Sequence, residues 1–305
     1  MKSILIVGGA GFAGLGLAKR LMERGDRVKV LDIMGKNQTE YLGVDVEYAW
    51  KAVHDISLGD VMGFDIVIDL AAQADVPMGF TSPKWTCYEN VYGTLCLFEV
   101  LKDANIDRVL VAGSGNEYGR PKYLPIDEEH PLTPHNPYAW SKACQEMCAW
   151  AYQRCYDVPV TVMSNGCVSG PGMRREIFIF KWLWNILQGL PIVLEGGTQT
   201  RDLTYVDDVL DAWMLAIDSH RDIVVGEKWQ VSYGDERRVI DILDLCLQEG
   251  DMRTEVIHRP HRPGEDGQRE LFATAKAREL LGYEPKIGVE ENIKLTAEWI
   301  RGLLQ

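Results

Sequence analysis

A glycine-rich turn between an apolar strand and a helix is the feature that most restricts how this chain can fold. Residues 4–7, Ile-Leu-Ile-Val, form an apolar run of the kind that a buried parallel strand requires. Gly8, Gly11 and Gly14 follow at a spacing of three residues, and apolar residues then recur at helical spacing. A second apolar run at 28–31 completes one strand–helix–strand unit.

The same unit predicts a nucleotide-binding site. Glycine lets the backbone turn tightly and approach a pyrophosphate, whose negative charge suits the N-terminus of the following helix. Asp32 ends the second strand 18 residues after Gly14, close to the spacing expected of a carboxylate on an adenosine ribose. Tight turns that bind nothing also use glycine, but the ordered strand, turn, helix, strand and acid favour a nucleotide.

Two later strand ends belong to the same pattern. Asp55-Ile56 follows the third predicted strand, where Asp55 either meets an adenine edge or caps a short helix that starts near Ser57. Leu70, Ala71 and Ala72 follow the fourth strand, and small residues there allow a ligand to approach the backbone closely.

Composition and charge exclude several classes of function. The formal net charge is −13 with no basic block, so we expect no nucleic-acid partner, although a few arginines would suffice for an anionic substrate. No apolar run reaches the roughly 18 residues of a membrane span, and no signal peptide is recognisable. Of the seven cysteines, Cys144, Cys148 and Cys155 fall on one helix face. We interpret them as a buried apolar stripe, not a metal site, and expect a reducing cytoplasm.

A serine, a tyrosine and a lysine are the candidate catalytic residues. Ser114 lies just after the fifth apolar strand, at the strand edge where chemistry occurs in parallel sheets. A helix predicted over 137–156, with Asn136 as its N-cap, places Tyr138 and Lys142 one turn apart on one face. A cation close to a phenol stabilises the phenolate, which makes tyrosine a usable base near neutral pH.

The C-terminal part of the chain differs in composition from about residue 164. Glycine-rich loops separate its helices, and we find no internal repeat. Arg201, in one such segment, either reaches a diphosphate or is an ordinary surface arginine. A second loop, 258–265, carries further arginines.

Taken together, these motifs resemble the extended short-chain dehydrogenase/reductase superfamily, within its nucleotide-sugar epimerase/dehydratase group. The resemblance covers nearly the whole chain and rests on nine segments in order: Gly8-Gly9-Ala10-Gly11-Phe12-Ala13-Gly14, Asp32, Asp55-Ile56, Asn90-Val91-Tyr92-Gly93-Thr94, Ser114 four residues before Tyr118-Gly119, Pro137-Tyr138-Ala-x-Ser-Lys142, Gly170-Pro171-Gly172, Arg201-Asp202-x-x-Tyr205-Val206-Asp207-Asp208-Val209 and Arg262-Pro263-Gly264-Glu265.

The resemblance implies a doubly wound parallel α/β sheet of about seven strands that binds NAD, followed by a smaller substrate region. Residues 1–165 would form the NAD domain, to which 203–231 return, and 166–305 would bind a nucleoside-diphosphate sugar. Two helices, which carry Asn90 and Tyr138, are expected to form a four-helix bundle in a homodimer.

By the same resemblance, Tyr138 is the acid/base, Lys142 holds the ribose and tunes Tyr138, and Ser114 orients the sugar hydroxyl. Ser114, Asn116, Arg201, Arg262 and Glu265 are the expected substrate contacts. The expected cofactor contacts are Gly8, Gly11, Phe12, Ala13, Gly14, Asp32, Asp55, Ile56, Leu70, Ala71, Ala72, Asn90, Tyr138 and Lys142.

Departures from the family pattern bear on the reaction. Ser164-Asn165-Gly166-Cys167 replaces the usual Arg-x-x-Asn, which puts the ordinary sugar-phosphate contact in doubt. Gly115 and Asn116 stand where 4,6-dehydratases carry Asp-Glu and decarboxylases a glutamate, and neither can do acid/base work. Glu117, one residue later, would point away if the strand register continued.

The leading hypothesis is an NAD-dependent nucleoside-diphosphate-sugar epimerase, most plausibly acting at C4 through a 4-keto sugar. The first alternative is a reductase of a 4-keto-6-deoxy nucleotide sugar, which Ser114-Gly115-x-Glu117-Tyr118-Gly119 also resembles. A 4,6-dehydratase or decarboxylase is less favoured, and a non-catalytic NAD-binding scaffold least of all. The base and the sugar are not specified by the sequence.

Overall fold

The computed structural model describes residues 1–35, 43, 45–250 and 254–305. The chain divides into two compact units. Unit 1 consists of Met1–Glu117, Pro137–Ser164 and Trp213–Trp229, and unit 2 consists of Tyr118–Asn136, Asn165–Ala212 and Gln230–Gln305.

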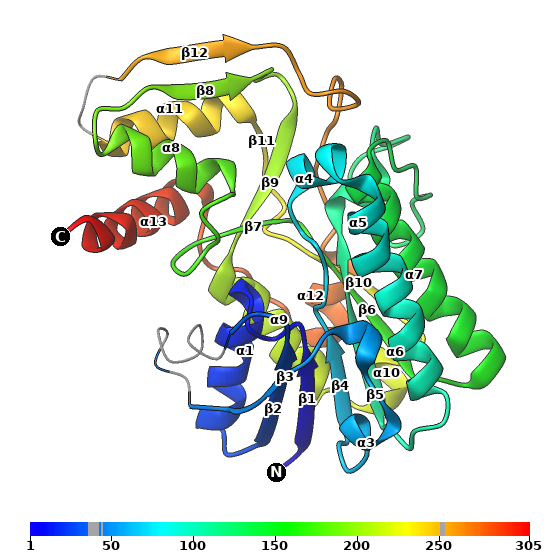
Figure 1. The fold of residues 1–305 in the computed structure, drawn as a ribbon. Helices are drawn as coiled ribbons and strands as arrows, with labels where there is room; N and C mark the ends of the chain where they lie inside the picture. Colours follow the sequence, from blue (N-terminus) through cyan, green and yellow to red (C-terminus); the bar gives the residue numbers. More distant parts are fainter. Residues whose placement is uncertain (36–42, 44, 251–253) are drawn as a thin grey trace. The chain divides into compact units, whose positions relative to one another are not determined.

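A seven-stranded sheet forms the centre of unit 1, with the strand order β10-β6-β5-β4-β1-β2-β3 (Figure 1). Its strands are β1 Ser3–Val7, β2 Arg27–Asp32, β3 Glu47–Trp50, β4 Ile66–Asp69, β5 Arg108–Ser114, β6 Val160–Asn165 and β10 Lys228–Val231. The pairs β1–β2, β1–β4, β2–β3 and β4–β5 are parallel. The order reverses between β1 and β4, which confirms the predicted doubly wound sheet and creates a switch point where such folds bind ligands.

Helices cover this sheet because its strands are apolar on both faces. Ile4, Leu5, Ile6 and Val7 all have no exposed surface. Alternate residues such as Leu5 and Val7 join one core cluster with helices α6 (Gly93–Leu101) and α7 (Pro137–Tyr156). The helices of unit 1 are α1 Phe12–Glu23, α3 Leu58–Val61, α4 Val76–Thr81, α5 Pro83–Cys87, α6 Gly93–Leu101, α7 Pro137–Tyr156 and α10 Arg221–Val224, with a π-helical turn η2 Tyr88–Tyr92 and 3₁₀ turns η1 Val53–Asp55 and η3 Gly115–Tyr118. Helix α9 Val206–Asp218 belongs to unit 2 up to Ala212 and to unit 1 from Trp213.

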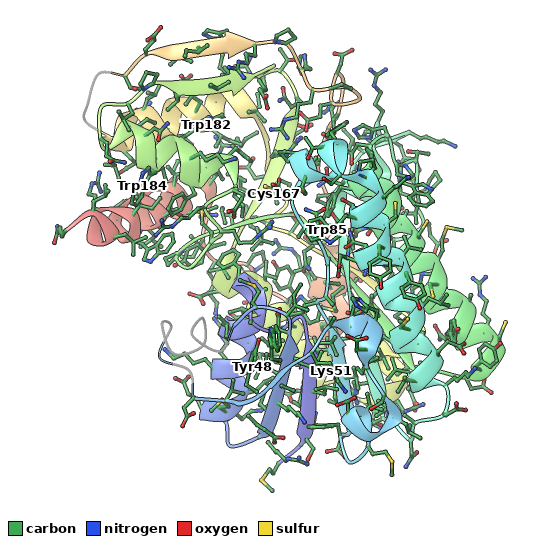
Figure 2. All side chains as sticks on the ribbon, in the orientation of Figure 1. Tyr48, Lys51, Trp85, Cys167, Trp182 and Trp184 are labelled. Carbon is green, nitrogen blue, oxygen red and sulfur yellow. The ribbon has the colours of Figure 1, made fainter. Side chains whose placement is uncertain are left out.

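Unit 2 contains two small sheets. One has the order β11-β9-β7, from Glu236–Arg238, Thr200–Tyr205 and Cys167–Ser169. The other pairs β12 Val256–Arg259 in parallel with β8 Ile192–Glu195. Helices α8 Phe178–Ile186, α11 Val239–Gly250 and α13 Val289–Leu304 pack together beside them, and α12 Ala275–Leu281 precedes α13. Trp182 and Trp184, labelled in Figure 2, belong to α8.

The structure bears on two predictions made from composition, the absence of a membrane span and the buried cysteine stripe. Within the described residues, no helix is both long and apolar enough to cross a bilayer. Cys144 and Cys148 on α7 are half-buried, whereas Cys155 near its end is exposed, so the prediction of one buried cysteine stripe is wrong for Cys155.

Candidate functional site

The glycine turn leads directly from β1 into α1, and its glycines differ in what they accommodate. A Cβ on Gly8 would lie 2.5 Å from the backbone of Ala71, and one on Gly14 would lie 2.5 Å from the carbonyl oxygen of Gly9. Close packing of the protein itself therefore requires glycine at these two positions. A Cβ on Gly11 would meet nothing closer than 3.7 Å, so packing against the protein does not explain this glycine.

Gly11 is also the N-cap of α1, with no side chain capping the helix and no acidic residue in the first turn. The backbone N–H groups of such a terminus attract an anion, and the missing Cβ leaves space above it. These properties fit the pyrophosphate of the predicted dinucleotide, with Phe12 and Ala13 opening the helix beside it.

The carboxylate of Asp32 is held at the end of β2, next to this turn. Its two oxygens accept hydrogen bonds from the backbone N–H groups of Ala10 and Met34, each at 2.9 Å. Asp32 is 8% exposed, so the residue that carries this fixed carboxylate is largely but not completely buried. This arrangement fits the predicted ribose contact.

The segment after β4 is fixed by Asn90, which lies in η2. The Asn90 amide accepts from the backbone N–H of Gln73 at 2.6 Å and donates to the Gln73 carbonyl and to the Ser141 hydroxyl. Asn90 has no exposed surface. Here it ties Leu70–Gln73 to α7, and its predicted contact with the cofactor would require the amide to change partners.

Asp55 does not cap the helix that follows it. The backbone N–H of Ser57 donates to Asp60 at 2.8 Å, and Ser57 and Asp60 form a capping box at α3. The side chain of Asp55 is 67% exposed. The capping alternative is therefore wrong, and the adenine contact of Asp55-Ile56 stays a prediction.

Tyr138 and Lys142 share one face near the start of α7, as the sequence spacing requires. Tyr138 is 8% exposed, and Gly79 in α4 packs so closely that a Cβ there would lie 3.1 Å from the Tyr138 Cβ. Ser114 ends β5, and its hydroxyl accepts from the backbone N–H of Asn116 at 3.3 Å. All of these residues belong to unit 1.

The Lys142 ammonium is buried and anchored by two acceptors. It donates to the carbonyl of Ala112 in β5 at 2.8 Å and to the side-chain oxygen of Gln145 at 2.7 Å. Burial lowers the pKa of Lys142, while the charges of Glu117, Asp69 and Glu146 act in the opposite direction. The ammonium therefore sits among three acids.

Glu117 belongs to a second buried group behind this lysine. The strand ends at Ser114 and the η3 turn follows, so strand alternation does not decide where Glu117 points. The side chain is completely buried, with one oxygen 4.0 Å from the Lys228 ammonium, which is itself 2.7 Å from Glu146. Burial, followed by the neighbouring Glu146, raises the pKa of Glu117 well above its usual value.

In unit 2, Arg201 lies on β9 between two carboxylates. Its guanidinium is 3.5 Å from Glu270 and 3.9 Å from Glu265, and it donates to the Thr200 carbonyl at 2.7 Å. The side chain is only 12% exposed, so Arg201 is not an ordinary surface arginine. Burial raises the pKa of Glu270 to about 7, although Arg201 opposes this shift.

Arg262 joins the same cluster through Glu265. The Arg262 guanidinium is 3.5 Å from Glu265 and pairs with Glu195 at the end of β8. The structure thus brings together Arg201, Arg262 and Glu265, the three residues predicted to bind the substrate in this half of the chain. Three carboxylates surround two guanidinium groups, so an anionic ligand has to compete for them.

Sequence reasoning missed several members of these groups. Gln145 lies three residues after Lys142, and this helical spacing could have revealed it. Glu270 and Lys228 carry no local signal, because their partners lie far away in the sequence. Within the described residues, no group of three or more acidic, histidine or cysteine side chains is arranged to hold a metal ion.

Comparison with known proteins gives one family. The sequence model described as "NAD dependent epimerase/dehydratase family" matches residues 4–232. A protein of Methanocaldococcus jannaschii is 31% identical over 98% of both chains. The UDP-glucose 4-epimerase of Mycolicibacterium smegmatis is 29% identical over 99% of both chains.

Solved structures of enzymes with two different activities have a fold similar to that of this chain. The UDP-glucose 4-epimerase of Thermotoga maritima, solved with UDP-glucose, gives a TM-score of 0.90 at 28% identity, over 99% of this chain and 100% of that one. DesIV of Streptomyces venezuelae, a dTDP-glucose 4,6-dehydratase solved with NAD and TYD bound, gives a TM-score of 0.91 at 25% identity, over 98% and 97% of the two chains.

Proposed function

Because the chain belongs to the NAD-dependent epimerase/dehydratase family, we propose that it is a nucleoside-diphosphate-sugar epimerase that inverts C4 of the sugar. Tyr138, Lys142 and Ser114, all in unit 1, supply the groups that this reaction needs. The UDP-glucose 4-epimerases among the similar proteins support this choice, while the 4,6-dehydratase among the similar structures shows that family membership alone does not decide it.

The absence of a second acid/base directly after Ser114 in the sequence carries the proposal. Elimination of water from a sugar needs a group that moves a proton at a second carbon, in addition to the group at the hydroxyl. Gly115 and Asn116 follow Ser114, and neither of them titrates. Glu117, the next carboxyl, is enclosed with Lys228 and Glu146 and has no exposed surface. Epimerisation needs only Tyr138 at the C4 hydroxyl; reduction of a 4-keto sugar needs no second group either, and the test below separates the two.

In the proposed mechanism, Tyr138 accepts the proton of the C4 hydroxyl. It returns the proton after the 4-keto sugar has rotated in the site and presents its opposite face. Bound NAD would supply the hydride acceptor and donor for C4. Lys142 stabilises the phenolate by its charge, and Ser114 donates a hydrogen bond to the reacting oxygen. Gly11 with the start of α1 and Asp32 would hold the pyrophosphate and ribose of the cofactor.

Unit 2 supplies the proposed nucleotide contacts. Arg201 and Arg262 would bind the diphosphate, because guanidinium groups match phosphate oxygens in charge and geometry. Glu265, which lies within 4 Å of both arginines, would accept hydrogen bonds from the nucleoside.

The test separates the epimerase from the keto-sugar reductase that the motif around Ser114 also resembles. The purified protein is denatured and the released nucleotides are identified, and fresh protein is incubated with UDP-glucose, UDP-glucuronate and dTDP-glucose. We expect retained NAD and interconversion of C4 epimers with no net NADH change. A protein without cofactor that oxidises reduced cofactor in proportion to a 4-keto sugar is a reductase, and release of a 4-keto-6-deoxy sugar identifies a dehydratase.

We also infer a homodimer formed through α5, η2, α6 and α7. These elements pack against one another in unit 1 (Figure 1), and Trp85 on α5 is labelled in Figure 2. They expose large apolar or aromatic side chains: Trp85, Tyr88, Tyr92, Leu95, Trp140 and Met147. Such a concentration of apolar surface is typical of a protein interface. Light scattering should give the mass of a dimer, and Tyr88→Glu should dissociate it. The control is Trp50→Glu, at an exposed residue of β3, which should leave the dimer intact.

A further inference from the structure

Gln145 is the side chain that fixes the candidate lysine, and the family resemblance assigns it no role. Its side-chain oxygen accepts from Lys142 at 2.7 Å. An ammonium can only donate, so this contact determines which end of the amide is oxygen. The amide nitrogen then donates to the Thr94 hydroxyl at 2.7 Å and to the Ala71 carbonyl at 3.2 Å.

These bonds connect three separate elements of unit 1. Lys142 and Gln145 lie on α7, Thr94 lies on α6, and Ala71 lies in the segment after β4. Gln145 is 2% exposed and Thr94 1%, so water cannot readily replace the amide. Both ends of the Gln145 amide are directed at these partners, which restricts it to one rotamer and one orientation.

These contacts fix the direction of the Lys142 side chain. Its ammonium has three donors, and within the described part of the chain the Ala112 carbonyl and Gln145 occupy two of them. A flexible four-carbon side chain would otherwise lose considerable entropy on binding a ligand. With two donors occupied by the protein, the position of the ammonium is set before any ligand arrives.

We propose that Gln145 is a positioning residue that holds the Lys142 ammonium ready for the cofactor. This inference rests on the proposed role of Lys142 in binding NAD. It also connects Lys142 to Ala71, so that two predicted cofactor contacts on different elements are held in one arrangement.

The test compares NAD binding in Gln145→Met with that in Gln153→Met, a matched change further along α7. Methionine keeps the volume but cannot accept from Lys142. We expect Gln145→Met to weaken NAD binding about tenfold by calorimetry, as the loss of one charge-assisted contact implies, and Gln153→Met to leave it unchanged. Gln145→Glu retains the acceptor for Lys142 but cannot donate to the Ala71 carbonyl, so it should recover part of the affinity.

Thr94→Val keeps the proposal testable should Gln145→Met fold poorly. It removes one of the two acceptors of the Gln145 amide without touching Lys142, and we expect NAD affinity to fall about threefold, with the effect absent when Gln145 is already methionine. NAD affinity equal to wild type in both Gln145→Met and Thr94→Val overturns the positioning role. Unchanged NAD affinity in Lys142→Ala would instead overturn the proposed role of Lys142 itself.

Discussion

The backbone N–H of Ala10 donates a 2.9 Å hydrogen bond to the carboxylate of Asp32, across the glycine turn. This bond joins the end of β2 to the loop after β1, and a second bond, from the Met34 N–H, holds the other oxygen. The carboxylate is consequently fixed and largely shielded, and any ribose substituent placed beside it meets a negative charge that cannot easily move away.

From this geometry we predict that the protein prefers NAD to NADP. A 2′-phosphate would be repelled by Asp32, whereas ribose hydroxyls can donate to it. Asp32→Asn removes the charge and keeps the shape, so the ratio of the two dissociation constants should fall by roughly tenfold or more. Asp26→Asn, at the opposite end of β2, is the control. Equal affinities of the wild-type protein for both cofactors would contradict the prediction.

The glycine turn allows a matched pair of substitutions. Gly14→Ala places a Cβ 2.5 Å from the Gly9 carbonyl oxygen, and we expect it to lower thermal stability. Gly11→Ala meets nothing closer than 3.7 Å, so the fold should be retained while the methyl group obstructs the pyrophosphate and weakens NAD binding. Melting curves and NAD calorimetry on both variants check this. Full NAD affinity in Gly11→Ala would show that the pyrophosphate does not lie there.

Glu270 predicts a pH dependence of substrate binding. Its pKa is raised to about 7 by burial, and Arg201, Asp202 and Glu265 are the charges that face it. Below this pH Glu270 is protonated and one competitor of the diphosphate for Arg201 is removed, whereas above it the ionised carboxylate competes for Arg201 as Glu265 does. The affinity for a UDP-hexose, whose diphosphate does not titrate in this range, should therefore fall several-fold between about pH 6 and pH 8.

Glu270→Gln should remove that dependence and retain the tighter binding at both pH values, while Glu290→Gln, on the exposed face of α13, should behave as wild type. Arg201→Ala should cost on the order of 2 kcal/mol in substrate binding, and it should also lower stability because the buried Glu270 loses its cation. If neither Arg201→Ala nor Arg262→Ala changes the affinity, these arginines do not hold the diphosphate.

The Lys228 ammonium compensates two buried carboxylates, and its removal should be costly. Lys228→Met removes the cation that pairs with Glu146 and lies 4.0 Å from Glu117, and breaking such a buried pair typically destabilises a protein by about 3–5 kcal/mol. Denaturant titration should show this loss, and Glu117→Val in the same chain should recover part of it. A Lys228→Met protein as stable as wild type would mean that water or rearrangement solvates the two acids.

The buried carboxyl of Glu117 also predicts how the stability of the protein depends on pH. The pKa of Glu117 is raised in the folded state, so the folded protein binds more protons than the unfolded chain above the usual value of 4.5. Its contribution to stability is therefore lost as pH rises through that range. Glu117→Gln should flatten the fall of unfolding free energy with pH. An unchanged slope would show that Glu117 is ionised in the folded state.

The sequence predicted what depends on local patterns. The strand–turn–helix unit, the extent of α7 from Pro137 to Tyr156 and the one-turn spacing of Tyr138 and Lys142 are confirmed, because hydrophobic periodicity is encoded in neighbouring residues. The family and its NAD dependence, predicted by resemblance, are confirmed as well. They could be predicted because the motifs of the family occur in a fixed order along the chain.

Long-range charge pairing could not be predicted in this way. Lys228 lies 82 residues after Glu146, and nothing near either residue shows that they meet. The cap of α3 could not be predicted for a different reason. Asp55 and Ser57 are both residue types that favour helix N-caps, so the sequence does not choose between them. Only the structure shows that Ser57 forms a capping box with Asp60. The direction of Glu117 could not be predicted for the same reason, since a 3₁₀ turn replaces the strand after Ser114.

The most direct test of the chemistry is Tyr138→Phe. The change removes the proposed proton-transfer group and keeps the ring, and Gly79 packs against the Cβ that both residues share, so the fold should be retained. NAD should still bind, because the glycine turn, Asp32 and Lys142 are intact. Turnover should fall by about 10² or more, the usual size of an acid/base contribution.

The assay for this variant follows interconversion of nucleotide sugars, since an epimerase produces no net NADH. Tyr156→Phe, at the exposed end of the same helix, is the matched control and should retain wild-type turnover. Loss of turnover with NAD still bound places the effect on proton transfer, because a structural defect would lower cofactor content as well. Near-normal turnover in Tyr138→Phe would rule out Tyr138 as the acid/base, and the epimerase mechanism proposed for this chain would fail with it.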